Sequence, residues 1–318
     1  MNGASPTKAS TRDSGTWPRW ALLAALLLGN AALAVGPWSV RLADSGPVSA
    51  GFWRLALALP FLAMFAFANG ERLGAVRGRT LMFVLLAGAA FGLDLASWHI
   101  GIEATRLGNA TMFGNSGSLI LMVWGFVVLR RLPIGGEWTA IAMAVIGATI
   151  LLARSSAISS ATVIGDMLCL LAGLFYAIYL LLLQRSRTTI GSWSLLFWAS
   201  LAGAPIMLML ALMRGEPVLP TDWTPVLVLM VLSQLVGQGL LVFSLRHFTP
   251  LVIGLALLTQ PAIAALTGWY AFGETIGAWD VLGMALLGLA LVVAKDFGAK
   301  GNRSVRADPP DMPDITPT

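Results

Sequence analysis

Ten apolar stretches of about 20 residues each follow one another along this chain, with only short polar connections between them. Each stretch is long enough to cross the hydrocarbon core of a bilayer as one α-helix. Charged residues make up 11% of the chain, against about 25% in soluble domains, so a water-soluble fold could not hide this much apolar surface. We therefore predict an all-α membrane protein with ten transmembrane helices, at residues 18–40, 47–69, 79–102, 107–129, 136–153, 163–184, 192–213, 223–245, 250–272 and 276–294.

The first apolar run admits a second interpretation, because Lys8, Arg12 and Arg19 precede it. A basic start, an apolar core and Ala32-Leu33-Ala34 as a cleavage site together resemble a secretory signal peptide. The run from Trp20 to Val40 is longer than the apolar region of such peptides, and many more spans follow it. We interpret it as the first transmembrane span.

Lysine and arginine are distributed unequally between the two sides that ten spans define. With the N-terminus in the cytoplasm, fifteen of them lie in cytoplasmic segments, and four lie on the opposite side: Arg41, Arg106, Arg154 and Arg214. Cytoplasmic loops of membrane proteins carry such an excess of positive charge. The sequence thus predicts an integral protein of the bacterial inner (plasma) membrane with both termini in the cytoplasm. The net charge of +5 is scattered along the chain and forms no patch for nucleic acid.

Two internal correspondences indicate that the second half of the chain repeats the first. A shift of 143 residues, then of 141, pairs Gly125 with Gly268, Arg131 with Glu274, Trp138 with Trp279 and Gly147 with Gly288. Because each copy has five spans, the second copy must enter the membrane upside down, as in many secondary transporters. We expect a cytoplasmic tail at 1–17, a first five-helix repeat at 18–153, a second at 163–294, and a disordered cytoplasmic tail at 296–318.

Several short motifs resemble one known family. They are Leu258-Thr259-Gln260-Pro261 through Gly273-Glu274, then Gly283 and Gly288, with Trp53-Arg54 and Thr105 to Thr111 in the first half. They are similar to the drug/metabolite transporter superfamily in its EamA-type branch, over about residues 20–295. The resemblance implies a ten-helix bundle of two inverted five-helix repeats around a central cavity. It also implies export of amino acids, other small metabolites or drugs.

The chain departs from that family's pattern at the fourth span. There the family usually has a proline, with a glutamate at the end of the span. Here the corresponding residues are Asn115-Ser116-Gly117-Ser118 and Arg130-Arg131. The substrates of better-known members therefore do not carry over to this chain on sequence alone.

Three polar side chains on different predicted spans lie at a similar depth below the outer surface. Arg54 lies roughly 10 Å deep, Asp94 roughly 12 Å deep, and Asn115 at a depth similar to that of Asp94. Polar groups inside hydrocarbon are costly and commonly mark function. Two interpretations are open: Arg54 and Asp94 form a static buried ion pair, or they bind the carboxylate and the ammonium of a zwitterionic substrate.

Trp98 and His99 follow Asp94 toward the outer end of the third span. Trp98 lies four residues further on and shares a helix face with Asp94, so we expect it to wall a binding site. His99 is rotated by about 140° from Asp94. Histidine titrates near neutral pH, which makes Asp94 and His99 candidates for proton coupling. We favour the alternative in which His99 is an interfacial histidine beside Trp98.

Further polar residues are predicted near the middle of the membrane. Ser233, Gln234 and Gln238 lie on the eighth span, with both glutamines on one face. Gln260 lies mid-way along the ninth span, before Pro261, which frees a backbone carbonyl one turn earlier. Interhelical hydrogen bonding would explain each residue singly, but their convergence favours a substrate site. The predicted binding residues are Arg54, Asp94, Trp98, Asn115, Tyr176, Gln234, Gln238 and Gln260, with Asn30 at a similar depth and with Trp53 and Trp269 as further wall residues.

The sequence gives no sign of a catalytic centre. It contains no phosphate-binding loop and no arrangement of nucleophile and base, and its two histidines and single cysteine, Cys169, make a metal site improbable. We therefore expect no cofactor, no metal and no enzymatic activity.

These observations favour a secondary active transporter that exports small metabolites such as amino acids by alternating access. Its expected partners are a small-molecule substrate, the lipid bilayer and protons as coupling ion. The alternatives within transport are drug efflux and metabolite uptake. Two alternatives outside transport are a membrane-embedded sensor or assembly subunit, which would need larger extramembrane segments, and a membrane-embedded lipid enzyme, which would need clustered acids, histidines or a nucleophile.

Overall fold

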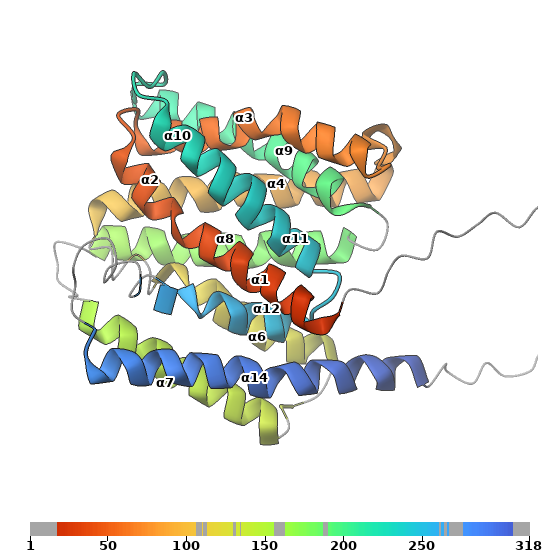
Figure 1. Cartoon of the computed structure of the whole chain (residues 1–318). Helices are drawn as coiled ribbons and strands as arrows, with labels where there is room; N and C mark the ends of the chain where they lie inside the picture. Colours follow the sequence, from red (N-terminus) through yellow and green to blue (C-terminus); the bar gives the residue numbers. More distant parts are fainter. Residues whose placement is uncertain are drawn as a thin grey trace, which may run out of the picture.

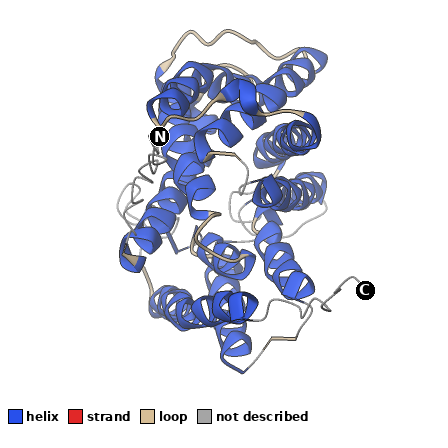
Figure 2. Cartoon of the chain, turned by 90° about the vertical axis from the view of Figure 1, so that its right-hand side faces the viewer, coloured by secondary structure: helices blue, strands red, loops and turns tan. Residues whose placement is uncertain are grey.

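The chain folds as a bundle of helices whose long axes run mostly in one direction, and the residues described contain no strand (Figures 1 and 2). The structure is a computed structural model. It describes residues 18–105, 110, 113–129, 132–133, 135–155, 163–186, 190–260, 262–263, 266 and 276–307. The helices of the first half are α1 (Arg19–Ala34), α2 (Gly36–Leu42), α3 (Pro47–Ala68), η1 (Leu73–Ala75), α4 (Gly78–Ala104), α6 (Ser116–Leu129) and α7 (Gly135–Ser155). Those of the second half are α8 (Val163–Ser186), α9 (Ser192–Met213), α10 (Thr224–Val228), η2 (Leu229–Gln238), α11 (Gly239–Ser244), α12 (Pro250–Leu257) and α14 (Ala278–Ala307).

Six helical segments are long and apolar enough to cross a bilayer, judged by length and composition. They are Arg19–Leu42, Pro47–Ala68, Gly78–Ala104, Val163–Ser186, Ser192–Met213 and Thr224–Ser244. Three shorter apolar helices are Ser116–Val127, Gly135–Ile150 and Ala278–Ala290. The expectation of an all-α membrane protein is confirmed at this level, and the helices lie close to the expected spans.

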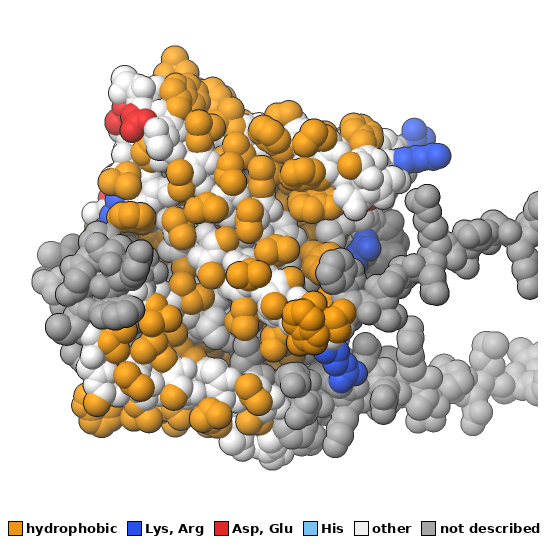
Figure 3. Space-filling model, in the orientation of Figure 1, with side chains coloured by type: hydrophobic (Ala, Val, Ile, Leu, Met, Phe, Trp, Pro, Cys, Tyr) orange, Lys and Arg blue, Asp and Glu red, His pale blue; other side chains and the backbone are white. Residues whose placement is uncertain are grey.

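The surface matches this reading (Figure 3). Apolar side chains cover the middle of the visible face, as expected for a surface that faces acyl chains. The visible aspartate and glutamate side chains lie at the left-hand end, and most of the visible lysine and arginine side chains lie at the right-hand end. The first described helix begins, and α14 ends, at the right-hand end (Figure 1).

The structure departs from the sequence expectations at both ends of the chain. The first span is interrupted at Val35, directly before Gly36-Pro37, because proline has no N–H to continue the hydrogen-bond ladder. At the other end, α14 continues to Ala307, so residues 296–307 are helical where we expected disorder. An alanine-, lysine- and arginine-containing sequence readily continues a helix that is already nucleated.

The eighth span contains a segment that the sequence did not reveal. Residues Leu229–Gln238 form η2, a π-helix, between α10 and α11. In a π-helix each N–H bonds to the carbonyl five residues earlier, and such segments occur frequently at functional sites. The face assigned to Gln234 and Gln238 assumed α-helical spacing. Both side chains are nevertheless buried, at 0% and 1% exposure.

Close helix contacts form where glycine allows backbones to approach. A Cβ added to Gly88 or Gly92 of α4 would press against the backbone of α9 at Ala199 or Gly203. Gly117 of α6 packs in the same way on the backbone of α8. Small residues at such crossings are typical of transmembrane bundles, because lipid tails offer no hydrophobic drive and packing must be close. The main packed pairs are α4 with α8 and α9, α3 with α9 and η2, α7 with α14, α6 with α12 and α8, and α1 with η2 and α12.

The helices α3 and α9 resemble each other in sequence and pack antiparallel. A shift of 145 residues aligns Gly46-Pro-Val-Ser-Ala-Gly-Phe-Trp53 with Gly191-Ser-Trp-Ser-Leu-Leu-Phe-Trp198. Both helices have 22 residues, and a proline lies at the same place inside each, Pro60 and Pro205. The two N-termini lie at opposite ends of the pair, because the start of α3 bonds to the loop after α9 through the N–H of Gly46 and the carbonyl of Pro217, at 3.2 Å.

Candidate functional site

A buried arginine forms the centre of a polar cluster between α3, α9 and η2. Arg54 of α3 is 3% exposed. Its Nε–H donates to Oε1 of Gln234 at 3.0 Å, and Nε2 of Gln234 donates to Oγ of Ser200 on α9 at 2.9 Å. Gln234 therefore bridges α3 and α9. Because its amide group has both a donor and an acceptor engaged, its orientation is fixed.

Asp94 of α4 lies near Arg54 but is not bonded to it. The two charges interact through space, while in the described part of the chain no ion pair joins them and no hydrogen bond reaches the Asp94 carboxylate. Asp94 is 8% exposed. A carboxylate and a guanidinium are thus held near each other inside the bundle without neutralising each other by contact. The static ion pair, one of our two sequence interpretations, is not formed in this structure.

Aromatic residues line the same region. The Phe91 and Tyr179 rings stack with centroids 4.4 Å apart and planes at 13°, and the Arg54 guanidinium lies 5.7 Å from the Phe91 centroid. Gln238 of η2 donates from Nε2 to the Tyr176 hydroxyl at 3.4 Å, and it accepts from the Tyr179 hydroxyl at 3.3 Å. The cluster therefore combines charge, amide groups, hydroxyl groups and ring faces from α3, α4, α8, α9 and η2.

Gln260 belongs to a different group of bonds. Its Nε2 donates to Oδ1 of Asn30 at 2.9 Å, and Nδ2 of Asn30 donates to the Ala256 carbonyl at 2.8 Å and to Oγ1 of Thr259 at 2.7 Å. These bonds join α1 to the end of α12, where α12 stops at Leu257. The arrangement satisfies the amide of Asn30, as interhelical hydrogen bonding would. Pro261 and Trp269, also singled out in the sequence, lie outside the described residues.

Trp98 and Asn115 lie together beside the cluster. A Cβ on Gly114 would come within 3.1 Å of Nε1 of Trp98, so the indole packs on the chain next to Asn115. Asn115 is buried at 8% exposure. Trp98 also packs against Ile102 and Cys169. The two predicted residues therefore share one neighbourhood on the side of α4 that packs on α8.

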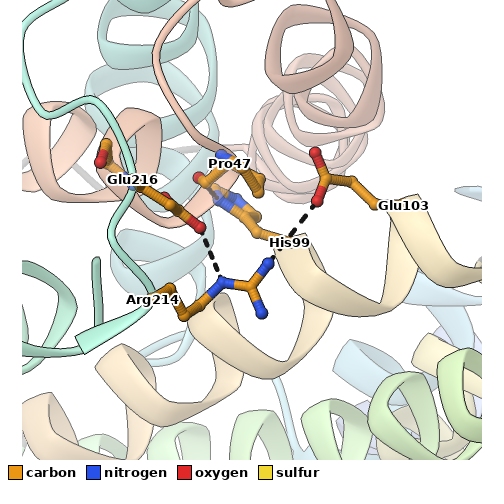
Figure 4. Close-up of polar contacts among 6 residues, drawn as sticks. Pro47, His99, Glu103, Arg214 and Glu216 are labelled. Carbon is orange, nitrogen blue, oxygen red and sulfur yellow. Dashed lines mark hydrogen bonds and ion pairs between the residues drawn. The ribbon is translucent and has the colours of Figure 1, made fainter. Parts of the chain in front are cut away.

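His99 lies beside Trp98, as expected, with ring centroids 5.7 Å apart, but its side chain is enclosed by the helices. It is fully buried, and its Nδ1–H donates to the carbonyl oxygen of Pro47 at 2.6 Å, while Nε2 has no partner among the described residues (Figure 4). Its ring also lies where a Cβ on Gly51 would be. The imidazole faces inward because the small Gly51 leaves room for it beside the first turn of α3. His99 thus ties α4 to the start of α3.

Three members of the cluster were not predicted from the sequence: Ser200, Phe91 and Tyr179. Ser200 could have been found from the 145-residue correspondence, since it lies one residue after the position equivalent to Arg54. Tyr179 lies three residues after Tyr176 and shares its helix face, so the i, i+3 rule pointed to it. Phe91 has no polar group and gives no signal of its own. Trp53, expected as a wall, instead bonds to the loop after α9 through Nε1 and the Val218 carbonyl at 2.6 Å.

The described residues contain no group of three or more histidine, cysteine, aspartate or glutamate side chains that could hold a metal ion. The donors and acceptors of the cluster instead suit an organic solute with both charges. A guanidinium fork recognises a carboxylate, and a carboxylate recognises an ammonium group. Polar residues buried between several membrane-spanning helices commonly mark the substrate pathway of a membrane transporter.

Comparison with known proteins finds one matching family model. Residues 163–294 match the EamA-like transporter family. The second half of the chain is therefore similar to the EamA-like transporter family, in agreement with the resemblance of its motifs.

Curated relatives extend the match to most of the chain. Threonine/homoserine exporter RhtA of Escherichia coli (strain K12) is 25% identical over 283 residues, which cover 89% of this chain and 92% of the relative. The protein of the same name from Salmonella typhimurium (strain LT2) is 24% identical over 293 residues, covering 92% and 95%. An uncharacterized transporter of Archaeoglobus fulgidus is 22% identical over 264 residues, covering 80% and 91%.

A solved crystal structure shares the fold. It superposes with a TM-score of 0.73 at 14% sequence identity and covers 88% of this chain and 98% of that chain. At this identity the likeness concerns the fold alone.

Proposed function

We propose that this protein is a secondary active transporter that exports small zwitterionic metabolites, such as amino acids, by alternating access. The observation that carries the proposal is that Arg54 and Asp94 are both buried inside the helix bundle, near each other and without a bond between them. Homology to threonine/homoserine exporters over about nine tenths of the chain supports the export of small metabolites. Threonine and homoserine are the first substrates to test.

The bonding of Arg54 supports a role in holding a carboxylate. Only its Nε–H is used, by Gln234, and its two terminal amino groups have no hydrogen-bond partner among the described residues. Those two groups form the face of the guanidinium that binds a carboxylate through two parallel bonds. Asp94 is the matching acceptor for an ammonium group, and Gln238 with Tyr176 offers polar contacts to the substrate side chain. We assign Trp98 and Asn115 to the wall beside Asp94, and Gln260 to the support of α1.

The packing supports two inverted five-helix repeats. In the order of the spans, α1 corresponds to α8, α3 to α9, α4 to the span that contains η2, α6 to α12, and α7 to α14. Replacing each helix by its counterpart turns the packed pair α1 with η2 into α8 with α4. The same replacement turns α3 with η2 into α9 with α4. The pairs α3 with α9, α6 with α12, and α7 with α14 are each exchanged for themselves. Every one of these pairs is observed, which is the pattern that a two-fold axis between the repeats produces. The units proposed are residues 18–153 and 163–294.

The ends of the bundle support the orientation proposed from the sequence. Acidic residues visible at one end and basic residues at the other (Figure 3) agree with a cytoplasmic basic end. The first described helix begins at the basic end and α14 ends there (Figure 1). Both termini are then cytoplasmic, in the inner membrane of a bacterium.

The proposal is tested by transport with purified protein in liposomes. Vesicles loaded with radiolabelled threonine or homoserine are diluted into buffer, and efflux is compared with that from vesicles that contain no protein. Competition by N-acetylthreonine, which lacks the ammonium, and by threoninol, which lacks the carboxylate, separates the two charges. We expect neither analogue to compete with the wild-type protein. Equal competition by both analogues and by threonine, or no movement of any amino acid, would refute the zwitterion site.

Matched variants assign the two roles. Asp94→Asn should bind N-acetylthreonine, which lacks the ammonium, and should lose threonine. Arg54→Gln should bind threoninol, which lacks the carboxylate, and should also lose threonine. Glu103→Gln, at the exposed end of α4, serves as the control and should transport as the wild type does. We also propose that Asp94 carries the coupling proton, so that Asp94→Asn abolishes efflux driven by a pH gradient. Unchanged pH-driven efflux in that variant would remove Asp94 from the coupling step.

A further inference from the structure

The two ends of the α3–α9 pair are closed by the same device. After each helix the chain turns through a glycine with positive φ, Gly70 (73°) and Gly215 (67°), and a glutamate follows directly, Glu71 and Glu216. The backbone N–H of each glutamate bonds back into the last turn of its own helix, to Ala66 and to Ala211. Both turns therefore aim a carboxylate in the same way.

Each carboxylate reaches the N-terminus of the other helix. Oε2 of Glu216, after α9, accepts the N–H of Ser49 in the first turn of α3 at 2.9 Å. Oε2 of Glu71, after α3, accepts the N–H of Ser194 in the first turn of α9 at 2.7 Å. An acidic group at this place satisfies a free N–H and faces the positive end of the helix dipole. The 145-residue shift relates every member of one contact to a member of the other.

Glycine makes room for both contacts. Gly46 and Gly191 precede the two helices, and a Cβ at either position would overlap the Glu216 or the Glu71 carboxylate. Neither glycine needs its freedom of φ there, since both have φ near −60°. Their small size is what admits the glutamate.

The two capped helix starts also hold the candidate site. Arg54 lies five residues after Ser49 on α3, and Ser200 lies six residues after Ser194 on α9. Both side chains hydrogen-bond to the same residue, Gln234. A shift of either helix start must therefore move one side of the cluster relative to the other.

We propose that Glu71 and Glu216 are reciprocal latches that set which side of the membrane the site faces. The proposal rests on alternating access. Opening toward the Glu216 end separates the start of α3 from the end of α9 and releases Glu216 while the Glu71 latch stays closed. Opening toward the Glu71 end does the opposite. The freed carboxylate and N–H groups lie at the ends of the spans, where water can solvate them, so each latch is reversible.

Two engineered cysteines can report the direction of opening. In a Cys169→Ala background, Ala90→Cys and Ser97→Cys lie one turn to either side of Asp94 on the same face of α4. Ala90 lies toward the Glu71 end and Ser97 toward the Glu216 end. Labelling by a membrane-impermeant maleimide is measured on right-side-out and inside-out vesicles.

We expect the two latch variants to shift labelling in opposite directions. Glu216→Gln should raise labelling of Ser97→Cys from the Glu216 side by roughly tenfold, as expected for the loss of one charge-assisted hydrogen bond. Glu71→Gln should raise labelling of Ala90→Cys from the other side and lower that of Ser97→Cys. The double variant should restore a ratio of the two labels near that of the wild type.

Several results would overturn the latch. A shift in the same direction for both single variants, or no shift with intact thermal unfolding, would show that the glutamates only stabilise the fold. Gly46→Ala and Gly191→Ala provide an independent pair, because they displace the carboxylates without changing charge, and they should reproduce the two opposite shifts. Arg72→Gln removes an exposed charge directly after Glu71 and should leave both labels unchanged.

The labelling experiment is independent of substrate identity. If the wild-type protein moved neither threonine nor homoserine, the proposed substrates would fail while the two label ratios still decided the latch. If transport were found and both latch variants labelled alike, the latch would fail and the proposed function would stand.

Discussion

The two ends of the α3–α9 pair use the same glutamate contact but differ in what surrounds it. At the Glu216 end, Nε of Arg214 pairs with Oε1 of Glu216 at 2.8 Å, and its Nη2 lies 3.9 Å from Oε2 of Glu103 on α4 (Figure 4). At the Glu71 end the residue equivalent to Arg214 is Asn69, whose Nδ2 donates only to the Phe65 carbonyl of its own helix.

A second extra link lies at the Glu216 end. The carboxylate of Asp44, before α3, accepts bonds from the backbone N–H groups of Thr221 and Asp222 at 3.0 Å and from the Thr221 hydroxyl. The Glu216 end is therefore tied to α4 and to the following loop. The Glu71 end has its glutamate, one tryptophan bond, and a bond from Nη2 of Arg246, after α11, to the Ile190 carbonyl before α9. The glutamate contact is common to both repeats. The two ends become unequal through residues that differ between the repeats, such as Arg214 in place of Asn69.

The largest effect is expected from charge reversal at the glutamates. Glu216→Lys places a cation against Arg214 and against the positive end of α3, and Glu216 has only 7% of its side chain exposed. We expect a loss of about 3 kcal/mol in the free energy of unfolding, as for a charge left without a partner at a buried site. Glu71→Lys, without an arginine bonded to its carboxylate, should cost about 1 kcal/mol. Thermal unfolding in detergent measures both, and equal losses would contradict the inequality of the two ends.

The paired tryptophans give a smaller difference. Nε1–H of Trp53 donates to the Val218 carbonyl at 2.6 Å, and Nε1–H of Trp198 donates to the Leu73 carbonyl at 3.2 Å. Replacing either by phenylalanine removes the bond and keeps most of the ring, so each should cost about 1 kcal/mol. We expect Trp53→Phe to cost more than Trp198→Phe, because Trp53 also packs edge-on against Trp223 at 5.1 Å. The reverse order in unfolding experiments would count against the Glu216 end as the tighter one.

Removing Arg214 should make the two ends more alike, with the Asp44 link still in place. Arg214→Gln deletes the links to Glu216 and Glu103, while Ser49 keeps its bond to Glu216. Arg214 is 40% exposed and Glu103 53%, so solvent screening limits the expected loss to about 0.5 kcal/mol. The ratio of Ser97→Cys labelling to Ala90→Cys labelling should rise, because the Glu216 end opens more readily. An unchanged ratio at both low and high salt would show that Arg214 does not strengthen the latch.

The smallest effect concerns acid. The pKa of Asp44 lies below its ordinary value of 3.8, because the Thr221 hydroxyl and the Asp222 N–H hydrogen-bond to the ionised carboxylate. A lowered pKa in the folded state means that this link stabilises the protein above pH 3.8 and is lost as the pH falls through the lower, folded value. Asp44→Asn should therefore flatten the fall in melting temperature at the acid end of a pH series. An identical fall in wild type and variant would show that the link contributes nothing.

Helices were predictable from this sequence because lipid imposes one rule on every span. Each run had to be apolar for about 20 residues, and the span expected at 192–213 coincides with α9. The break at Gly36-Pro37 carried a signal that the hydropathy pattern outweighed. The π-helical turns of η2 carried none, since Gln234 and Gln238 fit α-helical spacing equally well.

The candidate site was predictable as a set of residues but not as a set of contacts. Arg54, Asp94, Tyr176, Gln234 and Gln238 stood out because polar groups are rare in hydrocarbon. That Gln234 would bridge Arg54 and Ser200, while Gln260 would bond to Asn30, depends on which helices are neighbours. The reciprocal glutamates were visible in the sequence as a repeat, yet their bonds join residues 123 and 167 positions apart. No local rule could have paired them.

Pro60 and Pro205 give each helix of the pair a point of flexure. A proline ring cannot donate to the carbonyl four residues earlier, so one rung is missing at Ala56 in α3 and at Leu201 in α9. Each helix can hinge there at little cost, and its two halves need not tilt together. A tilt of the helix ends at one membrane face can then stop at the proline, so that the helices stay packed together at the opposite face.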